Sequence, residues 1–150
     1  MFIMKTLFND GWKFAELALN YKEMFKDEKP VLFNPEDYFA NAKTLDFADV
    51  RLPHDWMISN TKDLYRNSVG FYCKEFELSE AQVQNKHNAI RFEGVYMNSA
   101  VWVNGNLAGT WKYGYGTFEF DISDFVKEHA LFHCTLGLIR FVIRQSSSHC

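Results

Sequence analysis

The run from Phe92 to Gly105, FEGVYMNSAVWVNG, constrains the fold of this chain more than any other stretch. Residues 99–103 alternate between the two faces of an extended strand, with Ala100 and Trp102 on one face. The Asn104-Gly105 pair follows at once, and Asn-Gly accepts the positive φ angles that a two-residue type I′ turn needs. The pattern predicts a β-hairpin, which we expect at the centre of an antiparallel sheet.

Short extended segments recur along the rest of the chain. Alternating or apolar patterns of this kind cover residues 47–52, 72–78, 89–92 and 117–120. Pro53 closes the first of them, because proline cannot donate to a sheet ladder. Ser123 is expected to cap a short helix over residues 124–128. Many short strands without a long amphipathic helix predict an all-β sandwich.

Composition excludes several classes of protein. The chain has 150 residues, enough for one domain, with 47% hydrophobic and 23% charged residues, as in an ordinary globular protein. A net charge of −3 lacks the basic footprint that nucleic-acid binding requires, so we expect no nucleic-acid partner. No run approaches the ~18 apolar residues of a membrane span, so we expect no membrane partner.

The cysteines and the N-terminus indicate a cytoplasmic protein. Three cysteines, an odd number at wide spacing, fit a reducing compartment better than a disulfide framework. The N-terminal segment has no basic residue ahead of its short apolar stretch and meets charge at Asp10 and Lys13, so it does not resemble a signal peptide.

Five motifs follow one another in a characteristic order. They are Leu52-Pro53-His54-Asp55-Trp56, Gly70-Phe71-Tyr72 with Phe76, Phe92-Glu93-Gly94-Val95 with Val101-Trp102-Val103-Asn104-Gly105, Gly114-Tyr115 with Phe118, and Asp121-Ile122-Ser123. In this order they resemble the N-terminal sugar-binding domain of family 2 glycoside hydrolases, above all the β-galactosidases, over residues 9–128. The resemblance implies a jelly-roll β-sandwich of the galactose-binding-domain-like type.

The resemblance also implies a function. Family 2 enzymes hydrolyse O-glycosidic bonds with retention, using two glutamates, and both glutamates lie in a later barrel that has no counterpart in this chain. We therefore expect a non-catalytic domain that is inactive by itself, with a galactoside and the missing C-terminal domains of the same enzyme as its partners. No cofactor is expected.

The resemblance ends near Glu128. The family continues with a turn, a strand of alternating valines and an aromatic segment, whereas this chain continues with HALFHCTLGLIRFVIRQSSSHC. We interpret residues 1–128 as the sugar-binding-type domain and residues 129–150 as a divergent tail. Residues 136–143 could form a last strand ahead of a disordered end. The departure suggests a truncated or frame-disrupted reading of a longer gene.

The residues after Pro53 are the first candidates for sugar binding. A carboxylate such as Asp55 accepts hydrogen bonds from sugar hydroxyls, and an indole such as Trp56 stacks on the apolar face of a pyranose. In the resembled family, loops of this domain reach towards the sugar pocket of the barrel, so His54, Asp55 and Trp56 are expected to bind substrate. The alternative is that His54 and Asp55 only hold the turn while Trp56 fills the core.

A second candidate region precedes the hairpin. Tyr96 and Asn98 lie where the strand is interrupted, and Gly94 predicts a β-bulge that re-aims side chains towards a site. The alternative is a bulge that serves only the shape of the sandwich. The loop Tyr113-Gly114-Tyr115-Gly116 could bind sugar or pack on a neighbouring domain, and the second is favoured.

Two other functions stay open. A free-standing carbohydrate-binding module could recognise sugar with Trp56, Tyr113 or Tyr115, and a purely structural sandwich could serve as an interaction surface. Glu93 and Asp121 are interpreted as structural carboxylates that cap turns at strand ends. The histidines and cysteine at residues 129–134 lie in the tail without a Cys-x-x-Cys pair, so no metal site is expected.

Overall fold

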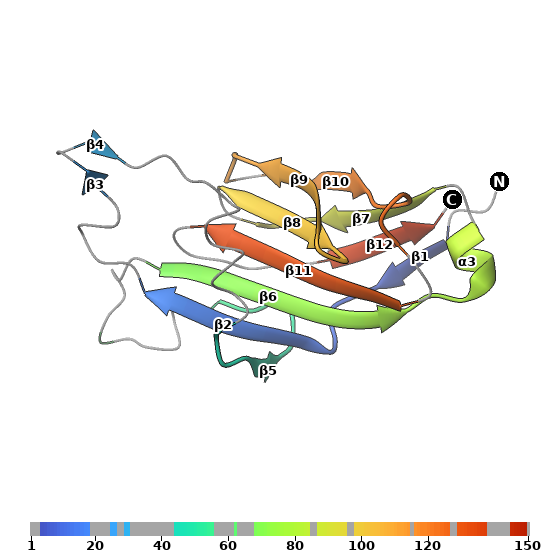
Figure 1. The fold of residues 1–150 in the computed structure, drawn as a ribbon, viewed down its shortest axis with the longest axis horizontal. Helices are drawn as coiled ribbons and strands as arrows, with labels where there is room; N and C mark the ends of the chain where they lie inside the picture. Colours follow the sequence, from blue (N-terminus) through green and yellow to red (C-terminus); the bar gives the residue numbers. More distant parts are fainter. Residues whose placement is uncertain are drawn as a thin grey trace.

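Two antiparallel β-sheets make up most of the computed structural model (Figure 1). The structure describes residues 4–18, 25–26, 29–30, 44–55, 62, 68–84, 87–95, 98–114, 116–126, 129–137 and 145–149. The larger sheet has six strands in the order β5 (Ala48–Val50), β2 (Trp12–Ala18), β6 (Ser68–Glu77), β11 (His129–Gly137), β8 (Ser99–Val103) and β9 (Asn106–Trp111). The smaller sheet has four, in the order β1 (Met4–Leu7), β12 (Gln145–His149), β7 (Asn88–Phe92) and β10 (Phe118–Asp121).

The remaining described elements are short. A two-stranded ribbon pairs β3 (Phe25–Lys26) with β4 (Lys29–Pro30). A five-residue helix, α3 (Glu80–Gln84), joins β6 in the larger sheet to β7 in the smaller one. Its first turn is a capping box, in which the amide of Ser79 donates to Gln82 Oε1 (2.9 Å) and the amide of Gln82 donates to Ser79 Oγ (3.3 Å).

The core lies between the two sheets. Tyr72 and Val101 of the larger sheet form one buried cluster with Ile90, Phe92 and Phe118 of the smaller sheet. The chain crosses between the sheets repeatedly, as from β6 to β7 and from β7 to β8. The predicted all-β, jelly-roll sandwich is thereby confirmed. Apolar and polar residues alternate along its strands because one face of each strand packs against the opposite sheet.

The predicted hairpin is confirmed in the β8–β9 pair. Asn104 and Gly105 have φ angles of 49° and 80°, both positive as a type I′ turn requires. The side-chain amide of Asn104 donates to the carbonyl oxygen of Phe125 (2.8 Å), which ties the turn to the segment after β10. The hairpin lies at one edge of the larger sheet, with β9 as the edge strand, so the expectation of a central position was wrong.

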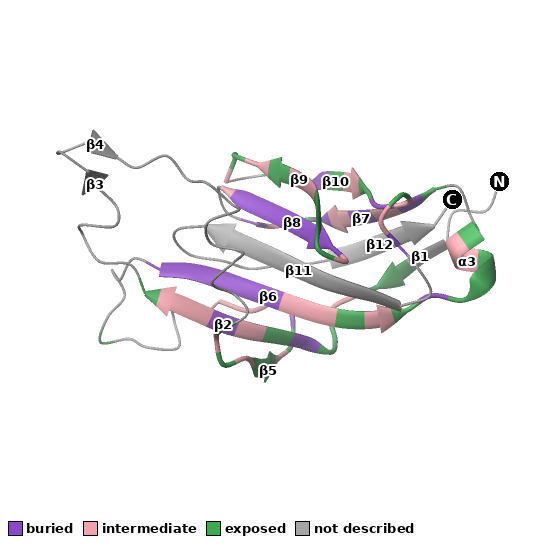
Figure 2. Cartoon of the chain, viewed as in Figure 1, coloured by how far each residue is buried: buried purple, intermediate pink, exposed green. Residues whose placement is uncertain are grey.

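Strand β8 is buried on both of its faces, as Figure 2 shows along its whole length. Val101 and Val103 belong to the core between the sheets. Ala100 and Trp102 point to the opposite face and are 0% and 3% exposed. The alternation read from the sequence is therefore present, although neither face of this strand contacts solvent.

Two local predictions were wrong. Gly94 lies in a bend after β7 rather than in a bulge, because β7 and β8 belong to different sheets and the chain must cross between them there. The irregularity that the structure does show faces Val101–Trp102, in β9. Ser123 begins a turn over residues 123–125 in place of the expected helix, closed by the amide of Val126, which donates to Ile122 O (3.1 Å); residues 127 and 128 of that expected helix lie outside the described part.

Residues 129–137 and 145–149, the described part of the expected tail, contribute one strand to each sheet. Strand β11 pairs with β6 along its whole length and with β8 on its other side, so it joins the two halves of the larger sheet. Strand β12 lies between β1 and β7 in the smaller sheet. A single strand was expected over residues 136–143. Strand β11 begins before that range and β12 begins after it, and residues 138–143 lie outside the described part.

Candidate functional site

The loop that carries His54 and Asp55 is fixed at its base. The amide of Leu52 donates to the carbonyl oxygen of Asn9 (3.0 Å), and the Leu52 side chain is buried in the core. Arg51 Nε lies 2.8 Å from Asp10 Oδ1 in an exposed ion pair beside it. The loop after β5 is thus attached to the turn before β2, and the Leu52–Pro53 peptide bond is cis.

His54 lies on the strands β2 and β6. Its Nδ1 atom is 2.8 Å from the hydroxyl oxygen of Tyr72, within hydrogen-bonding distance. The ring centre of Phe14 lies 4.9 Å from that of His54 and 4.9 Å from that of Tyr72. Phe14 and Tyr72 are direct partners across the β2–β6 pair, so the strand register itself builds the platform on which the imidazole sits.

Burial lowers the pKa of His54 below its ordinary value, and the neighbouring carboxylate of Asp55 opposes this shift. A lowered pKa means that the imidazole is neutral at pH 7. A neutral imidazole can accept a hydrogen bond from the Tyr72 hydroxyl through Nδ1 or, in its other tautomer, donate one to it. Either bond holds the ring in one orientation.

Asp55 follows this fixed histidine and is half-buried. An ionised carboxylate can accept hydrogen bonds from two neighbouring hydroxyl groups, which is how proteins hold the vicinal diol of a sugar. Trp56, the expected stacking partner, lies outside the described residues, as does Tyr96. Of the five predicted site residues, the structure places His54, Asp55 and Asn98.

Asn98 does not share a contact with the His54 loop in the described structure. It lies immediately before β8, in the left-handed region with a φ of 62°, and its amide donates to the carbonyl oxygen of Lys112 (3.4 Å). His54 packs on β2 and β6, and β11 separates β6 from β8. The two predicted regions therefore belong to different parts of the larger sheet.

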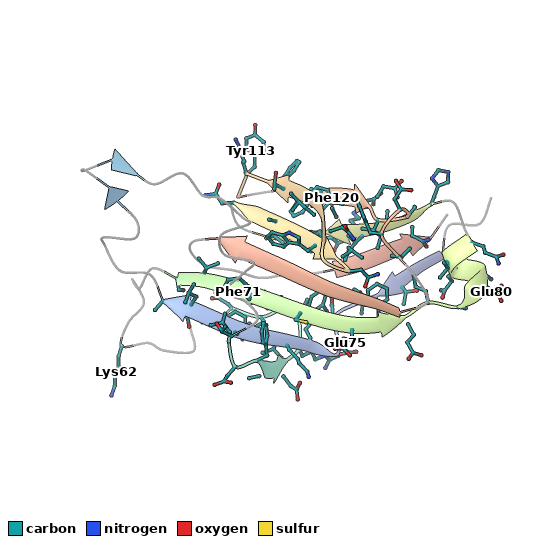
Figure 3. All side chains as sticks on the ribbon, viewed as in Figure 1. Lys62, Phe71, Glu75, Glu80, Tyr113 and Phe120 are labelled. Carbon is teal, nitrogen blue, oxygen red and sulfur yellow. The ribbon has the colours of Figure 1, made fainter. Side chains whose placement is uncertain are left out.

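An aromatic row extends from the core to the surface at the end of β9. Phe92 stacks on Phe118 (4.9 Å between ring centres), and Phe118 stacks on Trp111 (5.0 Å). Trp111 meets Tyr113 edge to face at 5.6 Å. Tyr113 is 69% exposed, and Figure 3 shows its side chain pointing away from the sheets. Tyr115, the second ring of this loop, lies outside the described residues.

Two further carboxylates lie at strand ends. Asp121 Oδ1 accepts hydrogen bonds from the amide (2.9 Å) and the hydroxyl (2.5 Å) of Ser123, and these bonds lower the pKa of Asp121. This Asx turn is the structural role expected for Asp121. Glu93 is exposed in the bend after β7. Among the described residues, no three histidine, cysteine or acidic side chains are grouped to hold a metal ion.

The sequence interpretation missed two side chains that organise the site. Tyr72 orients His54, and Lys74, on the same strand, donates to the carbonyl oxygens of Phe8 (3.4 Å) and Asp10 (2.5 Å). Burial lowers the pKa of Lys74, while Asp10 raises it. The sequence pattern of β6 could have indicated both residues, because Tyr72, Lys74 and Phe76 are alternate residues of one strand and share its inward face.

No helix in the described part is long and apolar enough to cross a membrane.

Comparisons with known proteins agree with this architecture. Residues 20–141 match the model of the sugar-binding domain of glycosyl hydrolase family 2. A candidate β-glucuronidase of Formosa agariphila is 31% identical over 134 residues, which are 83% of this chain and 11% of the relative. A β-galactosidase of Thermoanaerobacter pseudethanolicus is 37% identical over 120 residues, which are 80% of this chain and 14% of the relative.

A solved structure shows the same fold. A family 2 member from Bacteroides cellulosilyticus superposes with a TM-score of 0.67 over 97% of this chain and 20% of its own, at 22% identity. The fold and the matched model together define a sugar-binding β-sandwich. The chain belongs to glycosyl hydrolase family 2 and corresponds to the N-terminal sugar-binding domain of much longer enzymes, of whose length it spans between about a tenth and a fifth.

Proposed function

We propose that this chain is the non-catalytic sugar-binding domain of a β-galactosidase-like enzyme, and that its His54–Asp55 loop contributes one edge of a galactoside site. The observation that carries the proposal is the fixed loop: Leu52 and His54 are anchored, and the carboxylate that follows them is half-exposed. A preorganised carboxylate loses little conformational freedom when it accepts hydrogen bonds from a sugar.

The proposal assigns no catalysis to this chain. Retaining hydrolysis needs two carboxyl groups about 5 Å apart on either side of the scissile bond. Asp121 accepts hydrogen bonds from Ser123 in its Asx turn, and Asp55 is assigned to sugar binding, so we propose neither as an acid or a nucleophile. We expect the purified chain to release no nitrophenol from nitrophenyl β-galactoside above the buffer rate. Turnover that disappears in Asp55→Ala would contradict this assignment.

Binding by the chain alone should be weak. A single loop edge covers little of a ligand, whereas well-formed pockets bury about 70–90% of a drug-sized one. We expect millimolar or weaker affinity for galactose, about −4 kcal/mol or less favourable.

Amide chemical shifts during titration with galactose, lactose and glucuronate test the proposal. The shifts should centre on His54 and Asp55, with galactose preferred over glucuronate, and Asp55→Asn should abolish them. Asp49→Asn, an exposed carboxylate on β5, is the matched control and should leave them unchanged. A preference for glucuronate would change the proposed substrate from a galactoside to a glucuronide. Loss of binding in the control would contradict the specific role of Asp55.

A free-standing carbohydrate-binding module is the second candidate, and the exposed Tyr113 beside Trp111 favours it. Aromatic rings stack on pyranose faces without help from other domains. Micromolar binding with shifts centred on Tyr113, and no effect of Asp55→Asn, would support this function over the first.

A cytoplasmic location completes the proposal. Cys73 is a free thiol, and burial raises its pKa, so it is mainly protonated at neutral pH. A half-buried, protonated thiol on a central strand suits a reducing compartment. Fractionation of the producing cell tests this part independently.

A further inference from the structure

A pocket of about 120 Å³ opens in the sandwich, with a lining that includes no residue of the His54 loop. It lies where α3 connects the larger sheet to the smaller one, and Figure 1 shows α3 at the same end as β1. Its lining residues are Thr6, Phe8, Phe76, Glu77, Leu78, Gln82, Asn88, Ala89, Ile90 and Ile122. Both sheets and the helix therefore contribute to it.

Apolar side chains form most of the wall. Leu78, Ile90 and Ile122 are buried core residues. Phe8 and Phe76 stand edge to face, with 4.9 Å between their ring centres and an angle of 87° between their planes. A pair of perpendicular rings offers both a ring edge and a ring face, which are the surfaces that a further aromatic ring prefers to contact.

The polar residues of the lining come from β1, the end of β6, α3 and the start of β7: Thr6, Glu77, Gln82 and Asn88. Helix α3 is held in place at its first turn by the capping box and further on by Asn88, whose Nδ2 donates to Gln82 O (2.9 Å). A wall that combines many apolar atoms with a few polar side chains is typical of a site for a small organic molecule.

The volume narrows the choice of ligand. An apolar cavity of about 150 Å³ lined by leucine, isoleucine and phenylalanine stays dry and binds benzene. The present pocket, at about 120 Å³, is slightly smaller and has the same kind of lining. It therefore suits a single flat ring, and it is too small for a pyranose with its shell of hydroxyl groups.

We propose that this pocket is a binding site for a small neutral monocyclic aromatic compound of the phenol type. The ring lies against Phe8, Phe76 and the aliphatic wall, and the hydroxyl group is directed towards the polar side chains. The lining includes neither His54 nor Asp55, although its Phe8 ring also contacts the Lys74 ammonium group (3.8 Å), which holds the turn below the His54 loop. Because a ligand that binds only the folded state shifts the folding equilibrium, occupancy also stabilises the sandwich.

Titration of the full chain with phenol, followed by NMR, tests the proposal. We expect saturable shifts at Ala89, Ile90 and Ile122, and intermolecular NOEs from the ring protons to Phe8 and Phe76. Cyclohexanol has the same hydroxyl group on a thicker, non-aromatic ring and should bind at least tenfold more weakly. NOEs to other surfaces, or non-saturating shifts spread over the chain, would overturn the site.

A variant that fills the pocket provides a second test. Thr6 lies in line with Ile90 across β12, on the same face of the smaller sheet, so Thr6→Leu places additional methyl groups in the pocket and should weaken phenol binding at least tenfold. Thr110→Leu, the same substitution at an exposed position on β9, should leave binding unchanged. If Thr6→Leu does not fold, the NOEs of the unaltered chain still decide the question. Unchanged affinity in a folded Thr6→Leu chain would show that phenol binds elsewhere.

Discussion

The ammonium group of Lys74 lies 3.8 Å from the centre of the Phe8 ring. The same group donates to the carbonyl oxygens of Phe8 and Asp10, and Trp12 Nε1 donates to Phe8 O (2.6 Å). One lysine on β6 thus holds the turn that leads into β2. The turn in turn holds the His54 loop, because the amide of Leu52 donates to Asn9 O.

Replacing Lys74 should therefore cost stability. Lys74→Met keeps the aliphatic stem and removes the cation, so we expect a loss of about 1 to 2 kcal/mol in the free energy of unfolding, from the cation–π contact and the hydrogen bonds. Urea denaturation measures the change. Lys13→Met, exposed on the neighbouring strand, is the control and should change stability by less than about 0.5 kcal/mol. Equal losses of stability in Lys74→Met and Lys13→Met would show that the contacts of Lys74 with Phe8 and Asp10 do not stabilise the fold.

Removing the Tyr72 hydroxyl should release His54. Tyr72→Phe preserves the ring contact with Phe14 and deletes the hydrogen bond to Nδ1, at a cost of about 1 kcal/mol. The nitrogen-15 shift of Nδ1 should change because this atom loses its hydrogen-bond partner, a readout that a general loss of stability does not produce. An unchanged Nδ1 shift would mean that Tyr72 does not orient the ring.

Stability should fall on mild acidification. The unfolded histidine has a pKa of about 6.5, and the folded pKa of His54 lies below it because of burial. The unfolded state therefore binds more protons between the two values, so His54 lowers stability as pH decreases through 6.5 and ceases to do so below its folded pKa. Chemical denaturation at pH 7.5 and at decreasing pH, compared with His54→Gln, measures this contribution. Identical pH profiles for both chains would refute it.

Gly109 should not tolerate a side chain. A Cβ atom at this position of β9 would lie 2.6 Å from Phe120 Cδ1, so the ring would have to move away from the contact between the two sheets. We expect Gly109→Ala to destabilise the chain by about 1 to 3 kcal/mol, the usual cost of overpacking. Thermal unfolding measures it against Thr110→Ala, an exposed neighbour on the same strand. A neutral Gly109→Ala would show that Phe120 adapts freely.

Residues 129–137 should be required for folding. A chain that ends at residue 128 lacks β11, so the two halves of the larger sheet lose their connecting strand. We expect it to lack dispersed amide signals, whereas the full chain should show slow hydrogen exchange across 129–137. A folded, cooperative 1–128 chain, or fast exchange across 129–137, would show that the tail is dispensable.

The fold could be predicted largely because period-2 patterns and turn residues are local. Asn104-Gly105 defines its own turn, and residues 99–103 define their own faces. Which sheet a strand joins is not local. The sequence from β7 to β8 has the pattern of one interrupted strand. The residues around Gly94 carry no information on the distant partners, which are Phe118 for Phe92 and Trp111 for Ser99.

The candidate site shows the same division. The residue types of the His54–Asp55 loop predicted a polar edge, and the structure fixes that edge on β2 and β6. The role of Tyr72 could not be read from the sequence, since it arises from the register that places Phe14 opposite Tyr72. Asn98 was expected at the same site as the loop, but β11 lies between them, in a segment that we expected to depart from the family and that the family model in fact matches up to residue 141.

The position of β11 also governs the order of events on the ribosome. Strands β6 and β8 are synthesised before their common neighbour β11, and β1 is synthesised long before its partner, which spans residues 145–149. At a synthesis rate of about 5–20 residues per second, the nascent chain carries unsatisfied, largely apolar strand edges for several seconds. Such edges are templates for pairing with other chains, so newly made copies need shielding until the closing strand arrives.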